Sequence, residues 1–369
     1  MIERARVAAP PCEHVVEASS GILTPPQLAS LDAWLRAGRP AWVYWPREQT
    51  LEGVDRERLD SYRRLARVAA ALGPAARLAA FVPRRPRRRD PVSPVTPPSG
   101  VAPIRIDDAD KAAAQRQWDH NPVGTHYAQR AEPHTLAWFL EIERHRYRDY
   151  APWMPSLMEF DRHAGEDVLE IGGGVGTDLA QFARHGARVT DVDLSAGHLQ
   201  LAAENVRLRG LDGRFVHDDG EALPFPSASF DLVYANGVIH HTPDTPRLIA
   251  EIHRVLRPGG RVIAMVYAES SWHYWREQVW RNGLVRGRLA NESIGAILSD
   301  SVEVSANDAR PLVKVYSRER LLRLFAAFAD VTIVQRQLTA AELPLPLRPF
   351  RSALERVAGW NLIVKGRRP

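Results

Sequence analysis

Short apolar segments alternate with amphipathic stretches from about residue 167 onward. The apolar segments read VLEIGGG, ARVTDVDLS, GRFVHDD, FDLVYANG and RVIAMVYA, and helix-like sequence separates them. Strands that alternate with helices in this way are typical of a parallel sheet covered by helices on both faces. The pattern therefore predicts an α/β fold for the larger part of the chain, after a helical segment over residues 107–158.

A different pattern occupies the N-terminal part. Thr24 followed by two prolines predicts the start of a helix that continues to about Arg36. The apolar segment AWVYWP (41–46) predicts a buried strand, residues 55–72 a second helix, and RLAAFV (77–82) a second strand. We expect a small N-terminal α/β module over residues 1–82.

The stretch PRRPRRRDPVSPVTPPSGVAP joins the two regions. Proline fixes φ and removes a donor, and so polar a segment buries too little apolar surface to fold. We interpret residues 83–104 as a semi-stiff linker, and residues 105–369 as the second domain.

Charge and cysteine content exclude several classes of protein. The net charge is +5, and the run from Arg84 to Arg89 alone supplies five positive charges, so the rest of the chain is nearly balanced. We therefore expect no nucleic-acid partner, and interpret the run as part of a solvated linker. The single cysteine, Cys12, cannot form an internal disulfide. With no signal peptide recognisable and no long apolar run, we expect a cytoplasmic protein without stable membrane insertion.

A glycine-rich turn follows the first strand of the larger domain. Glu170 precedes Gly172, Gly174 and Gly176, an acidic-x-Gly-x-Gly-x-Gly spacing. Such a turn lets the backbone approach a ligand closely. A dinucleotide-binding fingerprint would need a glycine where Thr177 stands.

Acidic residues follow the next two strands. Asp193 ends the second strand, where a carboxylate can accept both hydrogens of a ribose diol. The third strand is followed by DDGEALPF (218–225). One of its first carboxylates can accept a hydrogen bond from an adenine amino group, and Leu223 can flank the ring.

The ordered set EIGGGVGTD, DVDLS, DDGEALPFPSASFDLV, NGVIHH and HRVLRPGG resembles the ubiquinone/menaquinone-type branch of class I methyltransferases. The resemblance is clear from about Val168 to Tyr267. It implies S-adenosylmethionine as cofactor and a Rossmann-like, mostly parallel sheet of seven strands with an antiparallel last strand. The segments VTIVQRQL (331–338) and WNLIVKGR (360–367) are the candidates for the final pair.

The same resemblance implies which residues bind the cofactor. Glu170 and the glycines would line its methionine part, and Asp193 would hold the ribose. Asp219 would accept from the adenine amino group, with Asp218 as the alternative, and Asn236 would contact the amino-acid end near the methyl group. The full set is Glu170, Gly172, Gly174, Gly176, Asp193, Leu194, Asp218, Asp219, Gly220 and Asn236.

His240 and His241 follow the fourth strand, at the edge of the sheet where ligands bind in such folds. Histidine suits proton abstraction from a hydroxyl at neutral pH, and some sugar O-methyltransferases of this family look as if they use such a pair. The alternative is that one or both histidines only cap or pack the loop.

The leading hypothesis is a methyltransferase that acts on a small molecule, at a hydroxyl of a sugar or secondary metabolite. The alternatives are carbon methylation of a quinone or isoprenoid lipid, and a cofactor-binding partner protein without catalysis. The Trp-rich segment 271–289 is interpreted as a substrate lid, as an amphipathic helix at a membrane surface, or as a helix that only packs on the fold with a solvated face. Trp118 and Tyr127 either contact cofactor or substrate or seal the top of the sheet. The spacing of His120, His126, His134 and His145 predicts no metal site.

Overall fold

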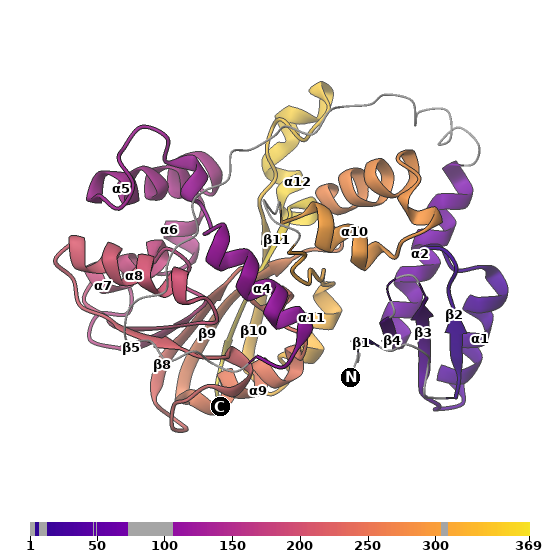
Figure 1. Cartoon of the computed structure of the whole chain (residues 1–369), viewed down its shortest axis with the longest axis horizontal. Helices are drawn as coiled ribbons and strands as arrows, with labels where there is room; N and C mark the ends of the chain where they lie inside the picture. Colours follow the sequence, from indigo (N-terminus) through magenta and orange to yellow (C-terminus); the bar gives the residue numbers. More distant parts are fainter. Residues whose placement is uncertain (1–3, 7–12, 47, 49, 73–105, 304–308) are drawn as a thin grey trace. The chain divides into compact units, whose positions relative to one another are not determined.

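The computed structural model describes residues 4–6, 13–46, 48, 50–72, 106–303 and 309–369 (Figure 1). The chain packs into two units, Met1–Arg88 with Trp272–Glu303, and Arg89–Ser271 with Val304–Pro369. The linker over residues 83–104, the strand over 77–82 and the Arg84–Arg89 run lie outside the described residues. The domain boundaries inferred from the sequence stay predictions.

The first unit contains, within its described residues, a four-stranded sheet in the order β1-β4-β3-β2. The strands and helices are β1 (Arg4–Arg6), β2 (Val15–Glu17), α1 (Pro25–Arg36), β3 (Ala41–Trp45), β4 (Thr50–Val54) and α2 (Arg56–Leu72). Thr24 and Gln27 form a capping box at the start of α1, so the predicted helix start is confirmed. Leu31, Val43 and Leu59 are buried in the core of this unit.

The Trp-rich segment packs within this same unit. It forms η5 (Tyr274–Val285), η6 (Arg288–Ala290) and α10 (Ile294–Ser301). The Gly21 N–H donates to the Leu289 carbonyl at 2.7 Å, and the Ser293 N–H and hydroxyl each donate to the Glu48 carboxylate at 2.7 Å. The three tryptophans of the segment are half-buried.

The second unit is built, in its described part, on a seven-stranded sheet in the order β10-β11-β9-β8-β5-β6-β7. All pairs from β9 to β7 are parallel, and β11 runs antiparallel to both of its neighbours. The predicted architecture and its final antiparallel strand are therefore confirmed. The strands are β5 (Asp167–Ile171), β6 (Arg188–Asp193), β7 (Arg214–His217), β8 (Phe230–Asn236), β9 (Leu256–Tyr267), β10 (Ala329–Arg336) and β11 (Asn361–Arg367).

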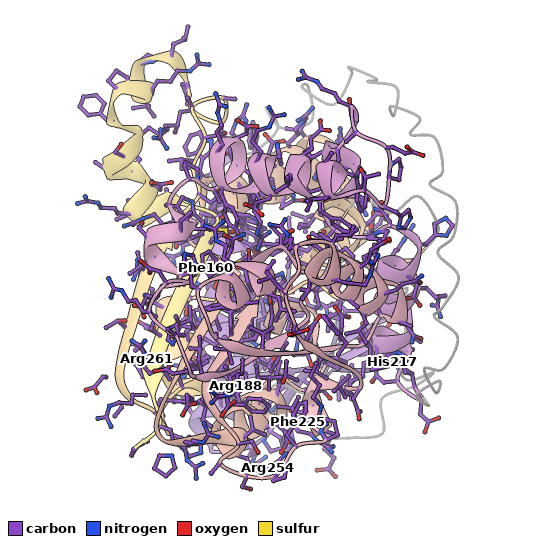
Figure 2. The ribbon with its side chains drawn as sticks, turned by 90° about the vertical axis from the view of Figure 1, so that its left-hand side faces the viewer. Phe160, Arg188, His217, Phe225, Arg254 and Arg261 are labelled. Carbon is purple, nitrogen blue, oxygen red and sulfur yellow. The ribbon has the colours of Figure 1, made fainter. Side chains whose placement is uncertain are left out.

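Helices cover both faces of this sheet because its strands are apolar on both sides. Along β8, Leu232 and Tyr234 belong to one hydrophobic cluster, whereas Val233 and Ala235 belong to the other. This alternation follows the period of two of a strand. Phe160 lies in the first cluster and Phe225 in the second, and both are labelled in Figure 2. The helices are α4 (Ala109–His120), α5 (Leu136–Arg144), α6 (Met154–Leu157), α7 (Thr177–Arg184), α8 (Ala196–Leu208), α9 (Thr245–Val255), α11 (Arg318–Leu324) and α12 (Arg351–Ala358).

Among the helices that the structure describes, none combines the length and the apolarity needed to cross a membrane.

Candidate active site

The strand order creates a switch point between β5 and β8. After β5 the chain adds β6 and β7 on one side of the sheet, then returns to place β8 on the other side. Ligands of open α/β sheets bind outside the carboxyl ends of the strands at such a point. The glycine turn follows β5, Asp193 ends β6, and the acidic turn of Asp218 and Asp219 follows β7.

The glycine turn needs its glycines for conformation and for close packing. Gly172 has φ 70°, and a Cβ there would lie 2.4 Å from a methyl group of Val238. Gly176 has φ 71°, and a Cβ there would lie 2.8 Å from the Cα of Ala202. Side chains at these positions would strain the backbone and push the turn away from the loop after β8 and from α8. The turn therefore stays close to the sheet edge.

Asp193 ties the end of β6 to this turn. Its Oδ2 accepts from the Gly174 N–H at 3.4 Å and from Nδ1 of His198 at 3.2 Å, and its Oδ1 accepts from the Ser195 N–H at 2.8 Å. A carboxylate offers about four lone-pair sites, so acceptor capacity remains. The next carbonyl, of Leu194, accepts from Gln115 at 3.1 Å.

Two buried carboxylates lie beside the turn with unused acceptor atoms. Within the described residues, Oε2 of Glu170 and Oδ2 of Asp191 have no hydrogen-bond partner, although both side chains are buried. Burial, and then the negative charge of Asp178, raises the pKa of Glu170 well above its usual range. Burial, and then Asp193, does the same to the pKa of Asp191. Such a cluster favours a cationic ligand.

Asn236 ends β8 next to a buried ion pair. Its Nδ2 donates to Oδ2 of Asp178 at 3.3 Å, and its Oδ1 is buried without a partner among the described residues. Arg146 holds the Asp178 carboxylate through two hydrogen bonds, at 2.7 Å and 2.6 Å. Asp178 is thereby fixed, and Asn236 presents an unused acceptor at the carboxyl edge of the sheet.

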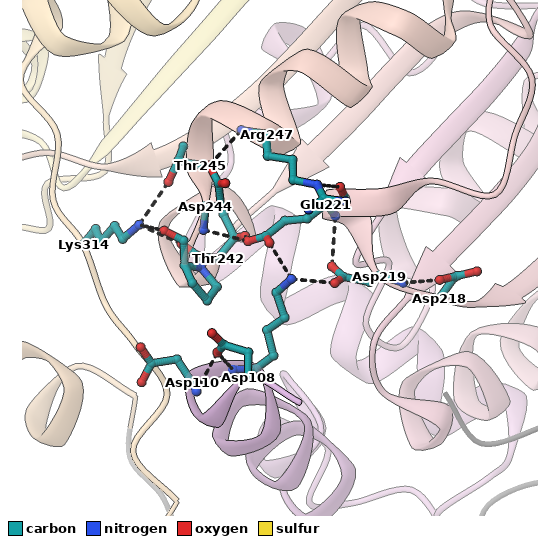
Figure 3. A network of polar contacts seen from close by, with 12 residues as sticks. Asp108, Asp110, Asp218, Asp219, Glu221, Thr242, Asp244, Thr245, Arg247 and Lys314 are labelled. Atoms are coloured by element: carbon teal, nitrogen blue, oxygen red, sulfur yellow. Dashed lines mark hydrogen bonds and ion pairs between the residues drawn. The ribbon is translucent and has the colours of Figure 1, made fainter. Parts of the chain in front are cut away.

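The acidic turn after β7 takes part in a network of polar contacts, in which Figure 3 labels Asp218, Asp219 and Glu221. Nζ of Lys111 donates to Asp219 at 2.6 Å and also to Glu221. The second oxygen of Asp219 accepts from the Glu221 N–H at 2.9 Å. The Asp218 carboxylate accepts from the Asp219 N–H at 2.8 Å. Among the described residues this is the one hydrogen bond that the carboxylate makes. A Cβ on Gly220 would lie 3.2 Å from Ile171, so the turn lies against the end of β5.

Helix α4 is attached to the carboxyl edge of the sheet by one stripe of side chains. Lys111, Gln115 and Asp119 are spaced by four residues and so share a helix face. Lys111 binds the turn after β7, and Gln115 donates to the Leu194 carbonyl. Asp119 binds the N-terminal end of α8, where it accepts from the Ser195 hydroxyl at 2.6 Å. We did not expect these contacts from the sequence, although the spacing of the stripe is visible in it.

Trp118 lies on the same helix between two predicted parts of the site. Its ring is 6.0 Å from that of His198, which holds Asp193, and 5.6 Å from that of His241. Tyr127 is exposed and stacks on His145 at 3.6 Å. The expected absence of a metal site at the four upstream histidines stays a prediction.

His240 and His241 lie in the short helix η4 (Ile239–His241) after β8, and their environments differ. Nδ1 of His241 donates to the Leu312 carbonyl at 2.7 Å, so the neutral ring carries its lone pair on Nε2. His240 is fully buried and packs on Tyr267 at 3.8 Å, and neither ring nitrogen has a hydrogen-bond partner among the described residues. Burial, and then His241, lowers the pKa of His240 well below its usual range, so His240 is neutral.

Comparison with known proteins identifies similar sequences. A family model described as a methyltransferase domain matches residues 169–264. Phthiotriol/phenolphthiotriol dimycocerosates methyltransferase 1 from Mycobacterium ulcerans is 32% identical over 202 residues, which cover 54% of this chain and 71% of that protein.

Two further relatives match a shorter stretch. Methyltransferase GfsG from Streptomyces halstedii is 41% identical over 105 residues, 28% of this chain and 38% of that protein. Demethylmenaquinone methyltransferase from Tropheryma whipplei is 34% identical over 106 residues, 28% of this chain and 43% of that protein. In these two comparisons the chain spans about two fifths of the relative's own length.

Proposed function

We propose, from the premise that this chain belongs to the class I S-adenosylmethionine-dependent methyltransferases, that it methylates a hydroxyl group of a small molecule, such as a sugar or a secondary metabolite. The membership rests on the methyltransferase-domain match and on the relative of which the chain covers 71%. S-adenosylmethionine is the cofactor. When bound, it supplies a methyl group attached to a positively charged sulfur. The sulfur is a good leaving group because it becomes a neutral thioether.

The residues around the glycine turn fit such a cofactor. S-adenosylmethionine carries two positive charges, on its amino group and on its sulfur. The unpartnered oxygens of Glu170, Asp191 and Asn236 are buried acceptors that a cation would satisfy. We assign Glu170, Gly172, Gly174 and Gly176 to the methionine part, and Asn236 to the amino-acid end.

For the nucleoside part we assign Asp193 and Leu194 to the ribose, and Gly220 with one acidic residue to the adenine. Of the two acidic candidates we favour Asp218. The Asp219 carboxylate already accepts from Lys111 and from the Glu221 N–H, whereas the Asp218 carboxylate accepts from the Asp219 N–H alone among described residues. Asp219 then acts as the residue that holds the turn and α4 together.

The hydrogen bond from His241 to the Leu312 carbonyl is the observation that carries the hydroxyl-methylation proposal. It directs the lone pair of the neutral ring to Nε2, which can take the hydroxyl proton as the substrate oxygen attacks the methyl group. The Leu312 carbonyl would stabilise the resulting imidazolium. His240 next to it stays neutral and adds no opposing charge.

Carbon methylation of a quinone or isoprenoid lipid is the second candidate, because one relative is named as a demethylmenaquinone methyltransferase. An activated ring carbon needs a histidine base less than a hydroxyl does. The methyltransferase names of the relatives argue against a partner protein without catalysis.

The experiment that distinguishes the two candidates identifies the bond that is formed. The purified full chain is incubated with S-adenosylmethionine labelled in its methyl group, and with parallel panels of sugar and polyketide alcohols and of demethylated quinols. Transfer to an alcohol oxygen, recognised by fragmentation of the labelled product, supports the proposal. Label found only on ring carbon would contradict it.

A further inference from the structure

The segment between β10 and β11 exposes large apolar side chains. It contains η7 (Leu345–Phe350) and α12. Leu345 is 73% exposed, Phe350 60% and Val357 63%, the highest values among the large hydrophobic side chains that the structure describes. Figure 1 shows α12 at the end of the β10–β11 pair that is remote from the C-terminus. Apolar exposure of this extent in one segment is typical of a binding surface.

The exposed apolar side chains of α12 and of Phe350, its N-cap residue, share one face. Phe350, Ala353 and Val357 follow the i, i+3, i+7 spacing of a helix side, and all three are exposed. Leu354, four residues after Phe350, and Ala358, four residues after Leu354, lie beside this stripe on α12 and are half-buried. The helix therefore packs on its own unit along one edge of its apolar stripe and leaves the other edge exposed to the solvent.

Arginines border this face. Arg348 and Arg356 are exposed, and Arg351 is half-buried. The nearby acid, Glu355, accepts from the backbone N–H groups of Gln337 at 3.0 Å and of Leu338 at 3.4 Å. Glu355 also lies 3.9 Å from the Arg351 guanidinium, so these two charges offset each other and Arg348 and Arg356 supply the positive charge that borders the face. An apolar face bordered by arginine is the pattern of a helix that lies in the surface of an anionic bilayer.

The segment also lies at the edge of the sheet that carries the candidate active site. In the sheet register Asn361, the first residue of β11, pairs with Tyr267, the last residue of β9. The Trp360 ring stacks on the Tyr267 ring at 4.4 Å, and Tyr267 in turn packs on His240 at 3.8 Å. A surface that bound this segment would therefore face the same edge as His240.

We propose that the Leu345–Val357 face docks the protein on an anionic lipid surface. Leu345, Phe350 and Val357 enter the boundary between head groups and acyl chains, and Arg348 and Arg356 bind lipid phosphates. The inference goes beyond the proposed chemistry and does not depend on which acceptor is methylated. It replaces the Trp-rich segment, whose tryptophans are half-buried, as the membrane-facing part.

Vesicle co-sedimentation of the full chain tests the proposal, with phosphatidylcholine vesicles that contain or lack phosphatidylglycerol. We expect sedimentation with the anionic vesicles, weakened by added salt. Phe350→Glu should reduce partitioning by about ten-fold or more, since it removes the aromatic side chain that would enter the lipid. Arg348→Ala and Arg356→Ala should each reduce it by about five-fold, and only for anionic vesicles.

The matched control is Leu140→Glu, which changes a large side chain that is 44% exposed on α5. This variant should sediment like the wild type, and equal melting temperatures confirm that the variants are folded. The proposal is wrong if the wild type stays in the supernatant or if Phe350→Glu sediments unchanged. A third outcome also contradicts it: the wild type binds no vesicles but associates with itself, and Phe350→Glu abolishes that association. A second copy of the chain would then cover the face.

Discussion

Nζ of Lys111 lies 2.6 Å from Oδ2 of Asp219, so helix α4 is joined to the turn after β7 across 108 residues of sequence. The same ammonium also binds Glu221, which is buried and accepts from the Asp244 N–H at 2.8 Å. One cation therefore compensates two carboxylates of the turn after β7. The contact connects the order of α4 to the shape of the proposed cofactor site.

Lys111→Met should lower the free energy of unfolding by about 2 kcal/mol, because it leaves the Glu221 and Asp219 carboxylates without their cation. It should also weaken the binding of S-adenosylhomocysteine, since α4 loses its first contact with the site. Urea unfolding and calorimetry measure the two effects. Arg116→Met, an exposed position on the same helix, should change both much less. An equal loss in the two variants would show that the helix, and not the ammonium, matters.

Asp218→Ala and Asp219→Ala should fail in different ways. Removing Asp218 deletes the proposed acceptor of the adenine amino group, so affinity for S-adenosylhomocysteine should fall by about 10–100-fold while stability changes little. Removing Asp219 breaks the contact with Lys111 and should mainly lower the free energy of unfolding. Calorimetry and urea unfolding of both variants decide the assignment. Loss of affinity confined to Asp219→Ala in a stable protein would return the adenine contact to Asp219.

Glu170 should make cofactor affinity depend on pH. Burial, and then Asp178, raises its pKa, so the cofactor-free protein keeps this carboxyl protonated and is destabilised as pH rises through the raised pKa. A cationic ligand favours the carboxylate, so affinity should increase over the same rise in pH. Glu170→Gln should therefore melt at a higher temperature than the wild type at about pH 8 without cofactor, by more than at about pH 5.5.

The same variant should bind S-adenosylmethionine more weakly at the higher pH and lose most of the pH dependence. Calorimetry at the two pH values checks this. An unchanged affinity together with unchanged stability would mean that the Glu170 carboxylate neither titrates in this range nor meets the cofactor.

The chain should also separate into parts along the two observed units. Removal of residues before Ile104 leaves segment 272–303 without the residues it packs on, including Gly21 and Glu48. We expect that truncated protein to aggregate more readily than the full chain. A second form, in which a Gly/Ser linker also replaces residues 272–303, should not aggregate more than the full chain and should bind S-adenosylhomocysteine. If the second form melts without cooperativity, the two units share a core and the division is wrong.

Much of the second unit was predictable because its signals are local. The strands from β5 to β9 are apolar and bounded by turn residues, and the spacing of Gly172, Gly174 and Gly176 predicts a tight turn. Order along the chain then indicates the switch point, since parallel strands need crossovers. The final pair, β10 and β11, was located to within two residues of its observed limits.

Other features depend on contacts between distant residues. The stripe of Lys111, Gln115 and Asp119 is legible as helix spacing, but its partners are known only once β6, β7 and α8 are placed. The short strands β1 and β2 have three residues each, too few for a period to appear. The packing of segment 272–303 with the N-terminal unit has no local signal. The sequence also does not show that His241, and not His240, donates to a backbone carbonyl.

The account depends most on His241 as the base that takes the proton of a hydroxyl acceptor. The decisive measurement is turnover of an accepted alcohol by His241→Ala, with S-adenosylhomocysteine affinity measured in parallel and His240→Phe as the matched packing control. We predict turnover lower by about 10²–10⁴-fold in His241→Ala, with affinity nearly unchanged, and a smaller loss in His240→Phe. Turnover of His241→Ala close to that of the wild type would contradict the account.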